Sequence, residues 1–179
     1  MNFESAVDRI RKGMSLSKEI PSFDAVNGNE NAKFLFLLEA PGPSAIASGH
    51  ISFDNPDPTA RNFKNQLASA EISRDEIAVW NVVPWYIGDS DKYQKIRASN
   101  KQDIDEGVEY LPEILDAMVS LQCIVLAGAA ARRAHVAISK MTTARILSCH
   151  HTSAQSMNAN PLAAGENIEI FKYMKKTSK

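Results

Sequence analysis

Four short apolar runs recur along the chain, and a polar or glycine-containing segment follows each of them. Continuous apolar runs of this length predict strands that are buried on both faces, since a strand with one solvated face alternates apolar and polar residues. The predicted strands cover residues 33–38, 77–83, 123–128 and 145–149. Apolar residues spaced by three and four positions predict helices in the other segments. The predicted helices cover 3–18, 58–70, 129–138 and 166–176, and one more begins near Ser99 or Asn100.

The alternation of strands and helices is typical of an α/β protein with a parallel sheet. We expect a three-layer α/β/α sandwich around a central four-stranded parallel sheet, with right-handed crossovers. The 179 residues suit a single domain over 1–179, with an N-terminal helix and loop at 1–32 and an α/β core at 33–179. Residues 39–58 and 154–165 are rich in Pro, Gly and polar residues and are predicted to be loops.

Three helix boundaries carry their own signals. Asp57 precedes Pro58 and is suited to cap a helix whose first residue is that proline. Gln102 and Asp103 are available for a capping box in the helix that begins near residue 100. Pro112 is expected to kink or break the same helix, because its ring clashes with the carbonyl four residues earlier.

Polar residues and a glycine mark the ends of the predicted strands. Glu39 follows the first strand, Asn81 lies in the second, Gly128 ends the third, and His150 and His151 follow the fourth. Taken singly, a Glu in such a place is usually solvated, and a His or a buried Asn is usually structural. The carboxyl ends of parallel strands share one edge, where ligands bind in open α/β sheets. The coincidence of these residues therefore predicts a ligand-binding cleft at that edge.

Composition and charge narrow the class of protein further. The net charge of −1 does not by itself indicate a nucleic-acid-binding protein, although a local basic patch is compatible with it. Cys123 and Cys149 lie in apolar runs and are predicted to be buried thiols in a reducing compartment, too few for an all-cysteine iron–sulfur cluster. The first 14 residues lack a signal-peptide core, and no run approaches the ~20 apolar residues of a membrane helix. These features favour a cytoplasmic location.

Several common catalytic motifs are absent from the sequence. Neither a lysine-bearing phosphate loop nor a dinucleotide fingerprint follows the first strand. Cys149, His150 and His151 are consecutive, which is not a spacing of zinc ligands, so we predict no metal site. A nucleophilic pair of Ser153 and His151 would lack the elbow motif that supports such a nucleophile.

Five segments resemble motifs of the uracil-DNA glycosylase superfamily in the family's order, and together they span roughly residues 33–175. Glu39-Ala40-Pro41-Gly42 resembles the first motif and is closest to the GEAPG form of the thermophile-type branches. Residues 49–63 resemble the glycine–phenylalanine segment with the helix after it, and Trp80–Pro84 resembles the TNVVKCRP strand. Val125–Ala130 resembles the ALG-x-x-A turn, and Ser148–Ser153 resembles the second motif, whose common form is HPS.

The resemblance implies a uracil-DNA glycosylase-like fold and a DNA glycosylase activity. Such an enzyme hydrolyses the N-glycosidic bond of uracil or a related deaminated base in base excision repair. It flips the damaged nucleotide out of the stack into a pocket, because the target atom is out of reach inside a duplex. The resemblance also implies that no metal or other cofactor takes part. The expected partner is DNA with a damaged or deaminated base, bound by a monomer, and no membrane contact is expected.

The resemblance supplies roles for individual pocket residues. Phe53 would stack on the pyrimidine, and Asn81 would present its amide to the Watson–Crick edge, where one acceptor and one donor match uracil. Ala40, Pro41 and Gly42 of the first motif would line the substrate site.

The groups for the chemical step have alternatives. His150 or His151 would donate a hydrogen bond to the uracil O2 as negative charge develops there. Glu39 is the first candidate for the carboxylate that orients water, and Asp57 or Asp54 could serve instead. An N-cap is the competing interpretation of Asp57.

Two residues near the second motif are candidates for DNA contact. Ser153 lies in a segment whose backbone amides would bind phosphate. Met157 is the apolar residue best placed to enter the gap left by a flipped base, with packing on the domain as the alternative.

The chain departs from the family pattern at several positions. Ala40 stands where many members carry Asp or Asn, Leu38 replaces the usual first Gly of the first motif, and His151 stands where the second motif usually has Pro. The cluster cysteines of the thermophile type are missing. Two alternatives therefore stay open. One is a non-catalytic superfamily member that binds a nucleobase or nucleic acid, and the other is a small α/β enzyme that acts on a free nucleoside.

Overall fold

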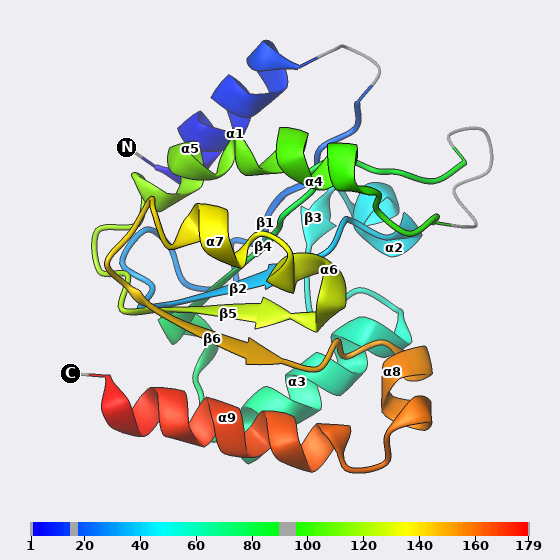
Figure 1. The fold of residues 1–179 in the computed structure, drawn as a ribbon, viewed down its shortest axis with the longest axis vertical. Coiled ribbons are helices and arrows are strands. Elements are labelled where there is room, and N and C mark those ends of the chain that lie inside the picture. The colour runs from blue at the N-terminus through cyan, green and yellow to red at the C-terminus, as the bar shows by residue number, and fades with distance from the viewer. Residues whose placement is uncertain (1, 15–17, 90–95, 179) are drawn as a thin grey trace.

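The computed structural model describes residues 2–14, 18–89 and 96–178. At its centre lies a sheet of four parallel strands in the order β4-β2-β5-β6 (Figure 1). The strands are β2 (Phe34–Leu38), β4 (Ile77–Asn81), β5 (Cys123–Ala127) and β6 (Arg145–Cys149). This sheet confirms the α/β class and the four-stranded parallel centre that the apolar runs predict.

Helices cover both faces of the sheet and complete the predicted three-layer sandwich (Figure 1). One layer contains α1 (Phe3–Gly13), α4 (Lys101–Val108), α5 (Leu111–Leu115), α6 (Gly128–Arg132) and α7 (His135–Ile138), and the other contains α3 (Pro58–Ser69) and α9 (Ala163–Thr177). Successive residues of a strand point to opposite faces, so Leu37 joins the apolar cluster under the first layer and Phe36 joins the second. Phe36 meets Phe63 of α3 and Phe171 of α9 edge to face, with ring centroids 4.9 and 5.2 Å apart.

Local capping sets the helix boundaries largely as predicted. Asp57 caps α3 by accepting a hydrogen bond from the Ala60 amide, with Pro58 as the first helical residue. Asn100 and Asp103 form a reciprocal capping box at the start of α4. Pro112 lies in the first turn of α5, where backbone amides have no partner within the helix, so its missing N–H costs nothing. The predicted helix is therefore divided into α4 and α5.

Two helix predictions are too long. The first helix ends at Gly13 rather than near residue 18, and residues 15–17 of that prediction lie outside the described residues. The predicted helix over 129–138 is interrupted between α6 and α7, although Arg133 and Ala134 keep helical backbone angles there.

The two segments predicted to be loops contain regular structure. Residues 39–58 hold α2 (Pro43–Ser48) and β3 (His50–Ile51), and β3 pairs in parallel with β1 (Ser22–Phe23). Residues 154–165 hold α8 (Ala154–Ala159) and the start of α9. Proline at the first turn of α2 and Ser153 as the N-cap of α8 are ordinary helix-start signals. The two helices were missed because both are short and lack an apolar stripe.

Because the four strands are parallel, their carboxyl ends share one edge of the sheet. Figure 1 shows β2, β5 and β6 pointing toward the side where α2, the start of α3 and α8 lie. The backbone pairing continues past β4, since the Val82 and Val83 amides donate to the carbonyls of Leu38 and Glu39. In the described ranges, no helix is long and apolar enough to span a bilayer.

Candidate active site at the carboxyl edge of the sheet

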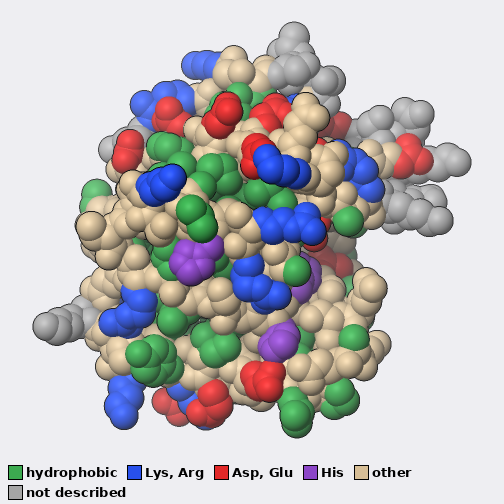
Figure 2. All heavy atoms as spheres, viewed as in Figure 1, with side chains coloured by type: hydrophobic (Ala, Val, Ile, Leu, Met, Phe, Trp, Pro, Cys, Tyr) green, Lys and Arg blue, Asp and Glu red, His purple; other side chains and the backbone are tan. Residues whose placement is uncertain are grey.

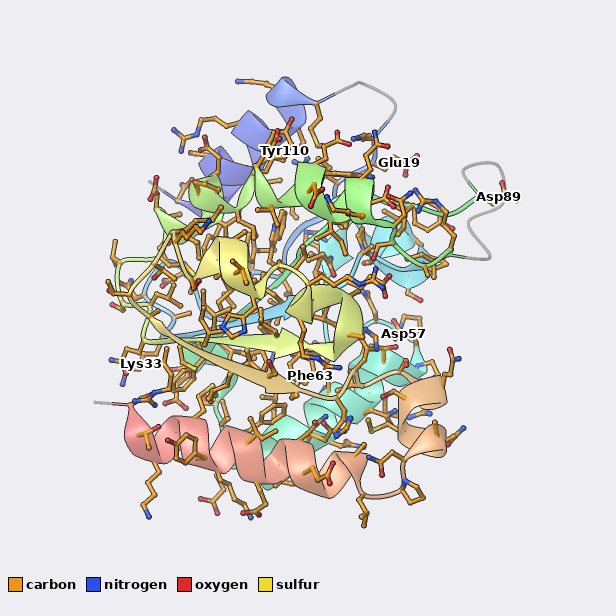
Figure 3. All side chains as sticks on the ribbon, in the orientation of Figure 1. Glu19, Lys33, Asp57, Phe63, Asp89 and Tyr110 are labelled. Atoms are coloured by element: carbon orange, nitrogen blue, oxygen red, sulfur yellow. The ribbon has the colours of Figure 1, made fainter. Side chains whose placement is uncertain are left out.

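A cavity of about 690 Å³ opens at the carboxyl edge, between the strand ends, α2, the start of α3 and α8. Most of the site residues expected from the sequence line it. These are Glu39, Ala40, Pro41, Gly42, Phe53, Asp57, Asn81, His151 and Ser153. His150, Met157 and Asp54 are not part of the lining. Figure 3 shows Asp57 at the start of α3, on the same side of the molecule as α8.

Glu39 follows β2 directly and brings a carboxylate to the cavity. One of its oxygens, Oε1, accepts hydrogen bonds from the backbone amide and the hydroxyl of Ser99, at 2.7 and 2.8 Å. Because both donors bind the same oxygen, Ser99 fixes the orientation of the carboxylate through Oε1.

Asn81 is the last residue of β4, and its side chain is buried at the cavity wall. Its amide nitrogen Nδ2 has no hydrogen-bond partner among the described residues. Buried polar groups in proteins are nearly always paired, because an unpaired one forfeits its hydration. An unpaired amide donor in a cavity wall is therefore suited to receive a ligand acceptor.

His151 lies two residues beyond β6, and the Ser153 backbone amide donates to its Nδ1 at 3.1 Å. A ring nitrogen that accepts a hydrogen bond carries no proton, so neutral His151 holds its proton on Nε2. Burial lowers the pKa of His151 below its usual 6.5, and the negative charge of Glu39 opposes this shift more weakly. A neutral imidazole with a donor at Nε2 is the favoured state of this residue at neutral pH.

Gly128 makes room for the His151 ring at the end of β5. Its φ of +91° lies in the left-handed region, which residues with a side chain rarely adopt. A Cβ at this position would lie 2.9 Å from the Cβ of His151. Both the backbone angle and the close approach of His151 therefore require glycine at this strand end.

His150 points away from the cavity and is held by α9. Its Nε2 lies 2.7 Å from a carboxylate oxygen of Glu166, near the surface. The fully buried Asn167 accepts from the His150 amide at 2.8 Å and donates to the His150 carbonyl at 3.1 Å. This double contact fixes the backbone just before His151.

Phe53 is buried in the cavity wall, and its ring meets Phe63 edge to face, with centroids 4.7 Å apart. The Arg74 guanidinium lies 5.6 Å from the Phe53 ring centroid. Phe53 therefore lies where a planar ligand in the cavity could contact its ring.

Arg74 connects this segment to the rest of the chain. Its guanidinium pairs with Asp24 at 2.8 Å and Asp54 at 2.6 Å, and it donates to the Asn27 side chain at 2.9 Å. The hydrogen bond from Arg74, aided by one from Lys64, lowers the pKa of Asp54 to about 2. Asp54 is thus a structural ion-pair partner outside the cavity.

Asp57, Ser153 and Met157 all serve local structure. Asp57 and Ser153 cap α3 and α8, and both also line the cavity. The Met157 sulfur accepts a hydrogen bond from Gln66 at 3.3 Å, which packs this half-buried residue on α3.

The sequence interpretation missed two residues beside Glu39. The sequence marked Ser99 only as a possible helix start and did not single out Arg97, yet Ser99 binds Glu39 and Arg97 lines the cavity. No pattern in the sequence links them to the first motif, because the contacts span about 60 residues.

A metal site and a cysteine nucleophile each set requirements for the part of the chain that the structure describes. No group of three or more His, Cys, Asp or Glu residues there could hold a metal ion. Cys123 and Cys149 are free and buried, and burial raises their pKa values to about 11 and about 12. Neither thiol lines the cavity, so neither is a candidate nucleophile.

Comparison with known proteins matches the sequence to a protein family and the fold to a solved structure. A family model described as the uracil DNA glycosylase superfamily matches residues 25–175. The fold resembles the solution NMR structure of a protein from Methanosarcina acetivorans whose assignment as a uracil DNA glycosylase is itself provisional. The two share 15% identity, with a TM-score of 0.59 over 87% of this chain and 98% of that one. The comparison with curated proteins finds no match.

Proposed function

This chain belongs to the uracil DNA glycosylase superfamily, and we propose that it hydrolyses the N-glycosidic bond of uracil, or of a related deaminated base, in DNA. The observation that carries the proposal is the buried, unpaired amide of Asn81 in the cavity wall. A base that offers an acceptor and a donor on its Watson–Crick edge would satisfy this amide. Uracil offers O4 and N3–H in that arrangement.

The flipped base would enter with its face against Phe53 and its edge against Asn81. Stacking tolerates any planar base, so the hydrogen bonds of Asn81 would supply the selectivity. A site that must pair a buried polar group rejects bases that leave the group unpaired.

Bond cleavage would use the groups of the strand ends. The bond between C1′ and the base nitrogen breaks, and its electron pair moves into the base, where negative charge develops on O2. The Nε2–H of His151 would donate to that oxygen. This donor is present in the neutral imidazole, which is the favoured protonation state of His151. Glu39 would orient the water whose oxygen bonds to C1′ and would accept the proton released.

Cationic side chains of α4 and of the end of α6 support an approach by DNA despite the net charge of −1. Figure 2 shows Lys and Arg side chains gathered over α6 and α4 on one face of the molecule. The exposed cations of these helices are Lys101, Arg132 and Arg133. We propose that they contact phosphates, that the protein acts as a monomer in the cytoplasm, and that it serves base excision repair.

The test is a base-release assay on oligonucleotides that carry one uracil, hypoxanthine or xanthine. Wild-type protein is expected to form abasic sites, and Asn81→Ala is expected to lower kcat/KM about 10- to 100-fold. Glu39→Gln and Asp57→Asn, assayed in parallel, identify the carboxylate, since Asp57 also lines the cavity. Folded wild-type protein that releases no base would contradict the proposal. Retained uracil binding would then favour a non-catalytic nucleobase-binding protein.

A further inference from the structure

We propose that Ser99 is a positioning residue that fixes the Glu39 carboxylate for its work on water. The inference rests on the proposed function, because it concerns the carboxylate that would orient the attacking water. Ser99 lies 60 residues from Glu39, just before α4. It acts through Glu39 and needs no contact with the substrate.

The geometry of the contact singles out one carboxylate oxygen. The amide and the hydroxyl of Ser99 both donate to Oε1, at 2.7 and 2.8 Å. No described residue donates to the other oxygen, Oε2, of Glu39. The terminal torsion of a glutamate is broad, so an unbound carboxylate would turn freely. Two short, charge-assisted hydrogen bonds to one oxygen stop this rotation and leave the second oxygen for water.

Ser99 can hold Glu39 because it is itself held firmly. It is 6% exposed, and its carbonyl accepts a hydrogen bond from Arg133 of the α6 end at 3.5 Å. On one side of Ser99, the Arg97 guanidinium forks onto Asp103 at 2.6 and 2.8 Å. On its other side, Asn100 and the same Asp103 form the capping box of α4. The segment from residue 97 to residue 103 is therefore a closed polar network.

This arrangement assigns each oxygen of Glu39 one task. Oε1 is bound to the protein, and Oε2 would take a proton from the water as its oxygen bonds to C1′. A water held at the right angle reacts faster than a loosely held one, because small displacements of the reacting groups are costly. Loss of the Ser99 hydroxyl should therefore slow the chemical step and leave substrate binding intact.

The first test compares Ser99→Ala with wild type in steady-state base release from uracil DNA. The variant keeps the backbone amide and loses the hydroxyl, so we expect kcat to fall about 10-fold with KM within about twofold. Ser99→Thr retains a hydroxyl and should recover most of the loss. Ser139→Ala is the matched control, because the Ser139 hydroxyl binds only the Val136 carbonyl on an exposed helix end.

A double-mutant cycle shows whether Ser99 acts through Glu39. In a Glu39→Gln background, Ser99→Ala should lower kcat by less than about twofold, because the positioned carboxylate is already gone. Equal effects of Ser99→Ala in both backgrounds, or a wild-type kcat in the single variant, would overturn the inference.

A crystallographic arm separates this inference from the proposed function. The Glu39 side chain should lose its single orientation in Ser99→Ala and keep it in Ser139→Ala. An unchanged Glu39 in the Ser99 variant contradicts the positioning role even if wild-type protein proves inactive. Failure of wild-type base release, by contrast, contradicts the proposed function and with it the role of Glu39 toward water, whereas the hold of Ser99 on Glu39 is decided by these crystal structures alone.

Discussion

The cavity has two walls that are built by different forces. The sheet wall consists of Glu39, Asn81 and His151, which follow or end three parallel strands. The loop wall consists of Ile51, Ser52, Phe53, Asn55 and Asp57. Strand pairing and burial in the apolar core hold the sheet wall in place, and every residue of β4 is buried. The loop wall is tied down by the ion pairs of Arg74, a residue 26% exposed.

The difference suggests a division of labour between the walls. The groups proposed to meet developing charge lie on the sheet wall, which strand pairing holds in place, and small displacements of such groups are costly. The ring proposed to stack on the base lies on the loop wall, where contact tolerates small shifts. Changes in the sheet wall should therefore lower kcat, and changes in the loop wall should mainly raise KM.

The largest effect should come from His151→Ala, which removes the proposed donor to the base O2. We expect kcat for uracil release to fall about 100- to 1,000-fold, the usual loss for one donor to a developing oxyanion. Single-turnover kinetics on uracil DNA measure this directly.

His150→Ala is the matched control, because it removes the neighbouring imidazole from the surface pair with Glu166. Its kcat should stay within about twofold of wild type. A larger loss in His150→Ala than in His151→Ala would reverse the assignment of the two residues.

A smaller loss of the same kind is expected for Gly128→Ala, which touches the sheet wall only indirectly. The new Cβ would lie 2.9 Å from the Cβ of His151, and the φ of +91° adds strain. We expect kcat to fall about 10-fold and the free energy of unfolding to drop by about 1–2 kcal/mol. Gly165→Ala is the control, since a Cβ at Gly165 meets nothing within 4 Å. Unchanged kcat in Gly128→Ala, with a shifted His151 in its crystal structure, would show that placement of this ring matters little.

The sheet wall was predictable from the sequence, and the reason is physical. Parallel strands bring their carboxyl ends to one edge, so four apolar runs place Glu39, Asn81 and the two histidines near one another. The choice between His150 and His151 was not predictable. It depends on the contacts of Asn167 and Ser153 to the backbone and ring beyond the strand end.

The loop wall was only partly predictable for a different reason. Phe53 was singled out through a motif resemblance, but α2 and β3 are too short to show a periodicity, and the role of Arg74 carried no local signal. Arg74 reaches Asp24 across 50 residues and Asp54 across 20. Single polar contacts over such distances leave no periodicity in a sequence. Ser99 escaped notice for the same reason.

The loop wall is tested by Arg74→Met, which keeps much of the side-chain bulk and removes the guanidinium. We expect KM for uracil DNA to rise about fivefold with kcat within about twofold, because the Phe53 segment loses its ties to Asp24 and Asp54. The free energy of unfolding should drop by about 1–2 kcal/mol, and the melting temperature should fall with it. Arg9→Met is the control, since Arg9 forms an exposed ion pair with Glu113 far from the cavity. A fall in kcat with unchanged KM would show that the loop wall shares in the chemistry.

The smallest expected effect is on the pH dependence of the free energy of unfolding, in which the two walls should differ. Burial lowers the pKa of His151 below 6.5, so the unfolded chain binds this proton first as pH falls. The free energy of unfolding should then drop below about pH 6.5, by at most about 1.4 kcal/mol per pH unit from this residue, until the folded pKa is passed. Denaturant titrations of wild type and His151→Gln isolate the contribution, because the other titrating groups are common to both. In the segment that carries the loop wall, the hydrogen bonds from Arg74 and Lys64 lower the pKa of Asp54 from 3.8 to about 2, so its contribution is complete above about pH 3.8 and is lost as the pH falls from there through about 2. A wild-type curve parallel to that of His151→Gln between pH 8 and 5 would mean that His151 takes up its proton as freely in the folded cavity as in water.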